Sequence, residues 1–140
     1  MYYFLSVLAG VLIAGMVVQN GRLADFYGVY ASTLFIHVVG LLFSLVFMAA
    51  KREPLRPKHH PAFKYYIGGV VGVATTLFNN MAFGHISISA ILALTLLGQS
   101  ITSFFIDSFG LFEMEKHPLD NRKLFGVALI AAGIALMITL

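Results

Sequence analysis

The chain has 140 residues, of which 59% are hydrophobic and 11% are charged, and its formal net charge is +3. Soluble domains average about 45–50% apolar and about 25% charged residues, so this composition excludes an ordinary soluble domain and indicates an integral membrane protein. The chain has no cysteine, which excludes a disulfide framework, a thiolate metal site and a cysteine nucleophile.

Five apolar segments are long enough to cross the hydrocarbon core of a bilayer, which is about 30 Å thick and takes roughly 20 helical residues. The first begins MYYFLSVLAG, without the opening cation or the cleavage site of a secretory signal, so we interpret it as a retained span. The predicted spans are residues 2–18, 27–50, 64–83, 88–111 and 123–140. The predicted fold is one all-α transmembrane domain over residues 1–140.

The connections between these spans are polar or short. Residues 19–25, 51–61 and 113–122 are the sizeable ones, and residues 84–87 must form a tight turn between the third and fourth spans. All six tyrosines lie at predicted span ends, as expected of an aromatic belt at the headgroup level.

The distribution of lysine and arginine predicts one orientation. With five spans, eight cations fall on the side of the N-terminus, and only Arg22 falls on the opposite side. By the positive-inside rule, the N-terminus is then cytoplasmic and the C-terminus lies outside. The eight cations are Lys51, Arg52, Arg56, Lys58, Lys64, Lys116, Arg122 and Lys123.

The chain contains no internal repeat long enough to form two halves, although many transporters consist of two inverted repeats around a midplane site. Five helices therefore supply one half, and a complete pore or pocket would need a second subunit. Small residues permit close helix packing in lipid. We expect packing within the chain at the glycine pairs of the first and third spans, and a subunit contact at Gly126 and Gly133 is equally compatible with the sequence.

Polar side chains recur along one face of the fourth span. Gln99, Ser103 and Asp107 are four residues apart, so they share one stripe of a helix. Such groups are costly in lipid, and a stripe of them faces protein or a water-filled cavity. Gln99 lies near the centre of the span, whereas Asp107 lies roughly 10 Å away, close to the cytoplasmic edge.

Other polar residues of the second and third spans lie at a depth similar to that of Gln99. The sequence thus predicts a midplane substrate pocket lined by Gln99, Asn79, Asn80, His37, Thr75 and Thr76. The alternative is that these groups only bond one another across helices, each pair contributing about 0.6 kcal/mol. The threonines favour this alternative, since a hydroxyl can bond its own helix; for Gln99 and the asparagines both interpretations stay open.

Two titratable residues lie inside predicted spans. Histidine titrates near neutral pH, so His37 could carry a proton, although a neutral histidine bonded within the bundle is the commoner outcome. Asp107 is the only acid in a span, and with Ser103 we assign it a structural or gating role. The cations within its reach for an ion pair are Lys64, Arg122 and Lys123.

The sequence predicts no enzyme, no cofactor and no metal site. It contains no nucleophile elbow, no phosphate-binding glycine loop and no acidic pair within a span. The other four histidines lie in loops without carboxylates at matching spacing.

Several short motifs cover nearly the whole chain. They are Asn20-x-x-Leu23-Ala24, GGVVG at residues 68–72, Gly98-Gln99, Ile106-Asp107-x-x-Gly110-Leu111, and Gly126-x-x-Leu129-x-x-x-Gly133-x-x-Leu136. In this order and spacing they resemble the YdcZ family of small membrane proteins, a branch of the drug/metabolite transporter superfamily.

The resemblance implies a five-helix subunit of the bacterial plasma (inner) membrane that works in an antiparallel pair. The strong cation bias favours a heterodimer with an oppositely oriented partner of similar sequence, and a homodimer is the alternative. Small multidrug resistance proteins, which are relatives in the superfamily, exchange protons at a first-span glutamate. This first span has no acid, so a direct copy of that mechanism is not expected. Met16 stands where the family often has glutamine, which weakens the case for a polar site on the first span.

The function predicted from these features is that of a transporter subunit that moves a small molecule by alternating access at the subunit interface. The alternative is a non-transporting membrane subunit that stabilises or regulates a larger complex. Neither reading involves nucleic acid.

Overall fold

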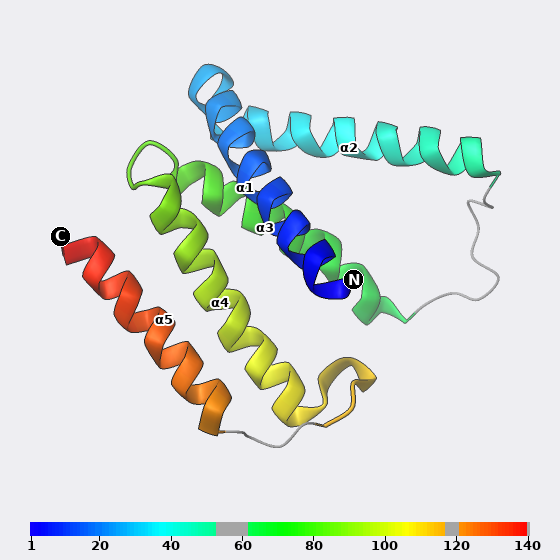
Figure 1. Cartoon of the computed structure of the whole chain (residues 1–140). Helices are drawn as coiled ribbons and strands as arrows, with labels where there is room; N and C mark the ends of the chain where they lie inside the picture. The colour runs from blue at the N-terminus through cyan, green and yellow to red at the C-terminus, as the bar shows by residue number, and fades with distance from the viewer. Residues whose placement is uncertain (53–61, 117–120, 140) are drawn as a thin grey trace. The chain divides into compact units, whose positions relative to one another are not determined.

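The computed structural model describes residues 1–52, 62–116 and 121–139, without the side chains of residues 64 and 121–123. This part of the chain folds into five α-helices, as predicted (Figure 1), together with two short 3-10 helices at Phe63–Tyr66 and Leu111–Glu113. The α-helices are α1 (Tyr2–Tyr27), α2 (Val29–Lys51), α3 (Ile67–Ala82), α4 (Ile88–Phe109) and α5 (Asn121–Thr139).

Three of these helices, α1, α2 and α4, are long and apolar enough to cross a membrane. The apolar stretches of α3 and α5, Ile67–Ala82 and Leu124–Thr139, are shorter. Most of the large apolar side chains on all five helices are exposed. Exposure on this scale requires lipid or another protein as the surrounding medium.

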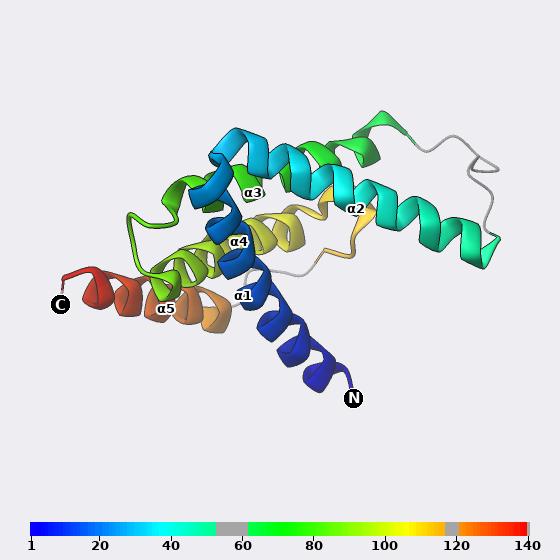
Figure 2. The same ribbon diagram turned by 90° about the horizontal axis from the view of Figure 1, so that it is seen from above.

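The chain divides into two compact units, residues 1–85 and 86–140. In the first unit, α1, α2 and α3 each pack against the other two. α1 and α2 meet at a corner and diverge from it (Figure 2). In the second unit, α4 and α5 pack side by side and run in opposite directions, as both views show.

The predicted connection at residues 19–25 is wrong, because α1 continues through it to Tyr27. Val17, Gly21 and Ala24 are buried and share one face of the helix, so packing holds the segment helical beyond the apolar stretch. The break comes at Gly28, whose φ of 82° and ψ of 156° suit glycine, and α2 begins at the next residue.

The predicted tight turn between the third and fourth spans is confirmed. Gly84 takes a φ of 80°, and the backbone N–H of His85 donates to the carbonyl of Ala82 at 3.1 Å. The hydroxyl of Ser87 then accepts from the backbone N–H of Ala90 at 3.2 Å, which caps the N-terminus of α4. Most of the predicted loop at 51–61 and residues 117–120 of the loop at 113–122 lie outside the described residues.

Glycine does not pack within the units as the sequence suggested. Apart from the neighbouring backbone of the same helix, no atom of the first unit lies within 4 Å of a methyl group built on Gly10, Gly68 or Gly72, so this unit shows no close packing at these glycines. The same holds in the second unit for Gly126 and Gly133, whose contact with a second subunit stays a prediction.

Gly21 is the glycine of α1 that makes a close contact. It is buried, and a methyl group on it would overlap the aromatic ring of Phe83, the residue that follows α3. The ring therefore lies directly on the backbone of α1 and fixes how closely the end of α3 approaches it. Only glycine permits this approach.

Replacing Gly21 with alanine should lower the free energy of unfolding by about 1–3 kcal/mol, because the added methyl group has no space beneath the Phe83 ring. Thermal melting in detergent measures the change. Gly15→Ala in the same helix is the control, since nothing lies within 4 Å of its methyl position, and it should leave stability unchanged or raise it by up to about 1 kcal/mol. Adding Phe83→Leu to Gly21→Ala should recover part of the loss; an undiminished loss would contradict the steric cause.

Candidate functional site

Five of the six residues predicted to bind substrate line one pocket of about 330 Å³ in the first unit. All three of its helices contribute: one residue comes from α2, five come from α3 and three from α1. The lining residues are His37; Gly72, Thr75, Thr76, Asn79 and Asn80; and Met16, Val17 and Asn20. The volume falls in the range of about 300–1,000 Å³ that is typical of small-molecule sites.

The wall formed by α3 presents hydroxyls and amides. Gly72, Thr76, Asn79 and Asn80 recur at helical spacing, so they share a face, and Thr75 flanks it. Thr75 donates its hydroxyl proton to the carbonyl of Val71 at 2.8 Å, and Thr76 donates to that of Gly72 at 3.1 Å. Each hydroxyl proton is thus hydrogen-bonded within its own helix, as expected for threonine, while the oxygen lone pairs can still accept a hydrogen bond.

Asn80 connects α3 to α2. Its side-chain nitrogen donates to the hydroxyl oxygen of Thr33 at 3.2 Å, and the Thr33 hydroxyl donates to the carbonyl of Val29 at 2.7 Å. Both side chains are buried, with exposed fractions of 3% for Asn80 and 5% for Thr33. For Asn80 the structure therefore shows the helix-bonding role that the sequence left open, at a position that also lines the pocket.

His37 is oriented by the same threonine. Its ring Nδ1 lies 2.8 Å from the backbone carbonyl oxygen of Thr33, one turn earlier in α2. A carbonyl oxygen only accepts, so Nδ1 is the donor in this contact. His37 also borders a second hollow of about 280 Å³ between α2 and α3, lined by Tyr30, Thr33, Leu34, Val73 and Leu77.

Asn20 is a lining residue that the sequence reasoning missed. The prediction ended the first span at residue 18 and placed Asn20 in a connection, whereas α1 carries it into the pocket wall beside Met16 and Val17. The available signal was the helical spacing of the small residues Gly21 and Ala24 with Val17, which continues the buried face past residue 18.

The polar stripe of α4 belongs to the second unit. There Ser103 and Asp107 line a pocket of about 320 Å³ between α4 and α5, together with Ser100, Phe104, Gly126, Val127 and Ile130. Gln99 is exposed in its unit and is not among these lining residues, so its place in a midplane pocket stays a prediction.

Asp107 is half-buried in this pocket. Its predicted ion pair with Lys64, Arg122 or Lys123 involves side chains outside the described residues.

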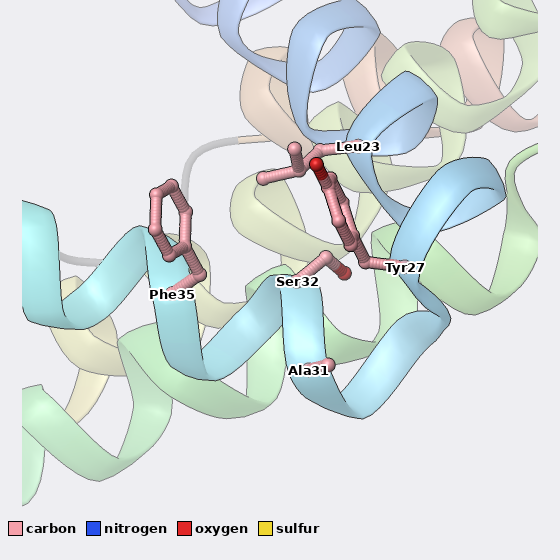
Figure 3. A pocket seen from close by; sticks show the side chains of 5 residues that line it. All are labelled: Leu23, Tyr27, Ala31, Ser32 and Phe35. Carbon is pink, nitrogen blue, oxygen red and sulfur yellow. The ribbon is translucent and has the colours of Figure 1, made fainter.

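A further pocket of about 320 Å³ lies at the corner between α1 and α2. The rings of Tyr27 and Phe35 flank Ser32 there, with Leu23 and Ala31 completing the lining (Figure 3). Ser32 is fully buried and donates to the carbonyl of Val29 at 3.0 Å. This corner presents only the hydroxyls of Ser32 and Tyr27 among apolar side chains, so it is a weaker candidate than the pocket lined by Asn20 and His37.

Among the described residues, no three His, Asp or Glu side chains gather closely enough to hold a metal ion. The polar chemistry of the main pocket is therefore that of amides, hydroxyls and one imidazole.

Apolar helices that could span a bilayer, with polar side chains turned into a shared pocket, define the class of membrane proteins that bind or move small molecules. The chain belongs to the family described as "Putative inner membrane exporter, YdcZ", whose model matches residues 1–136. No curated protein and no solved structure matches the chain. Membership confirms the resemblance noted in the sequence and makes the chain an inner-membrane protein. Its family is one of exporters, which move small molecules across the membrane, and not a family of enzymes.

The bond between Thr33 and Asn80 should stabilise the α2–α3 pair by about 0.6 kcal/mol and at most about 1.7 kcal/mol, the range of interhelical bonds in membrane proteins. A double-mutant cycle with Thr33→Val and Asn80→Leu measures it by thermal melting. The matched control is a cycle with Thr75→Val in place of Thr33→Val, because the Thr75 hydroxyl bonds only its own helix. Equal coupling in both cycles would contradict the assignment.

Proposed function

We propose that this chain is one half of a small-molecule exporter, and that an oppositely oriented subunit of similar sequence completes it. The observation that carries the proposal is the pocket lined by amides, hydroxyls and His37 within a largely apolar three-helix unit. Polar groups at such a place are costly and mark substrate paths in membrane proteins. Membership in an exporter family supports the same reading.

Two further observations support a second subunit. The helices of each unit leave most of their apolar surface exposed, and the two units are not repeats of each other: one has three helices and the other two. Inverted-repeat transporters place their substrate site at the interface of two such halves, which rock against each other around it. In this proposal Gln99 joins the pocket from α4, while Ser103 and Asp107 hold or gate the cytoplasmic end of that helix.

The pocket residues should be needed for flux and not for assembly. A thermal-shift screen of metabolites on the chain co-purified with its genomic neighbour identifies a stabilising compound, whose flux is then measured in proteoliposomes. Asn20→Ala and Gln99→Ala should each lower that flux about tenfold, corresponding to about 1.4 kcal/mol of lost binding, while size-exclusion profiles stay unchanged. Ser44→Ala is the control, because its hydroxyl bonds only the Gly40 carbonyl and lines none of the pockets described above. Loss of assembly in place of flux would favour a non-transporting subunit.

The cation bias should give this chain a single orientation. The natural chain has no cysteine, so one introduced cysteine reports the side on which it lies. A membrane-impermeant maleimide applied to intact spheroplasts should label Asp25→Cys and leave Glu115→Cys unlabelled until the membrane is opened. The cysteine-free chain is the blank. Partial labelling of both positions from outside would indicate dual topology and a homodimer.

A further inference from the structure

The pocket lined by Asn20, His37 and the α3 threonines has a definite hydrogen-bonding character, and this character bears on the class of molecule it takes. We propose that it binds uncharged, polyhydroxylated small molecules. The inference rests on the proposed function for its biological role, but the binding that it predicts can be measured without transport.

The lining is free of permanent charge. None of the nine described residues around the pocket is Asp, Glu, Lys or Arg, and His37 is its one titratable side chain. A permanent cation or anion that left water for this site would meet no lining group of opposite charge to offset its loss of hydration. The site therefore discriminates against permanent ions such as quaternary ammonium or phosphonium compounds.

The polar groups whose bonds are defined present acceptors to the pocket. The hydroxyl protons of Thr75 and Thr76 are committed to the carbonyls of Val71 and Gly72, so these oxygens offer lone pairs alone. The Nδ1 proton of His37 is committed to the Thr33 carbonyl, so Nε2 is the ring nitrogen left for a ligand.

Amides supply the complementary groups. Asn20 stands on α1, and its carboxamide carries both an acceptor oxygen and two N–H donors. Asn80 gives a donor to Thr33 and is fixed in place by that bond. A lining that combines two acceptor hydroxyls with an amide that both donates and accepts suits a molecule whose groups donate and accept in turn, which is the property of an alcohol with several hydroxyls.

Carbon chain length and hydroxyl count can be varied separately to test this. The full chain, co-purified with its partner, is titrated with erythritol, xylitol and sorbitol by calorimetry and thermal shift. 1,5-Pentanediol has the five-carbon skeleton of xylitol without its three inner hydroxyls, and methyltriphenylphosphonium is the cationic probe. At least one polyol should bind, pentanediol should bind at least about tenfold more weakly than xylitol, and the cation should not compete.

Variants connect the binding to the pocket. Thr75→Val and Thr76→Val keep the shape of the side chain and remove an acceptor, so each should weaken polyol binding about fivefold. Thr139→Val is the matched control, because the Thr139 hydroxyl bonds the Ala135 carbonyl near the end of α5 and lines none of these pockets. Melting temperatures without polyol should be the same for all three variants, since each lost hydroxyl bonds only its own helix.

The outcomes separate this inference from the proposed function. Binding of none of the polyols, or polyol binding that Thr75→Val and Thr76→Val leave unchanged, overturns the inference. Flux of the cation that depends on Asn20 also overturns it, while leaving the proposed exporter role intact. Polyol binding that is lost in the threonine variants, with no polyol flux in proteoliposomes, supports the inference and contradicts the exporter role.

Discussion

The constraint on which the structure depends is the cost of an unpaired polar group in a medium without water. Hydroxyls along the helices avoid this cost by bonding within their own helix: those of Ser44, Thr75 and Ser100 each donate to the carbonyl four residues earlier. Across the described part of the chain, no buried side-chain nitrogen or oxygen lacks a hydrogen-bond partner. Serine and threonine can therefore enter apolar helices at little cost, and polar side chains that cannot close such a local bond must find a partner across helices.

Thr33 is the residue at which helix packing and the candidate site meet. Its side chain links α2 to Asn80 of α3, and its backbone carbonyl accepts from Nδ1 of His37. One buried threonine thus sets both the distance between two helices and the hydrogen-bonding character of the pocket wall. A change at this position would alter stability and recognition together, so substitutions that report on binding alone lie at Thr75 and Thr76, whose hydroxyls bond only their own helix.

The helices and most of the residues that line the pocket could be predicted from the sequence, because both follow from helical periodicity and residue composition. Thr76, Asn79 and Asn80 share a helix face at any tertiary arrangement, and Gly84 with Ser87 marks a turn and a cap in any context. Asn20 was missed because hydropathy measures the apolar length of a segment and not where its helix ends. The link between Thr33 and Asn80 was missed because the rotation of α2 against α3 depends on contacts between helices that no single helix encodes.

The remaining glycines bear on the proposed second subunit. Glycine within a helix costs about 1 kcal/mol relative to alanine. Close contact with the Phe83 ring, which occupies the space of a side chain, offsets that cost at Gly21. Gly10, Gly68, Gly72, Gly126 and Gly133 have no such neighbour in the described chain. Helices associate in lipid at surfaces formed by small residues. The contacts that offset the cost of these glycines therefore lie outside each unit taken alone. Open glycine faces on α1, α3 and α5 are what an antiparallel partner would need to pack closely against this chain.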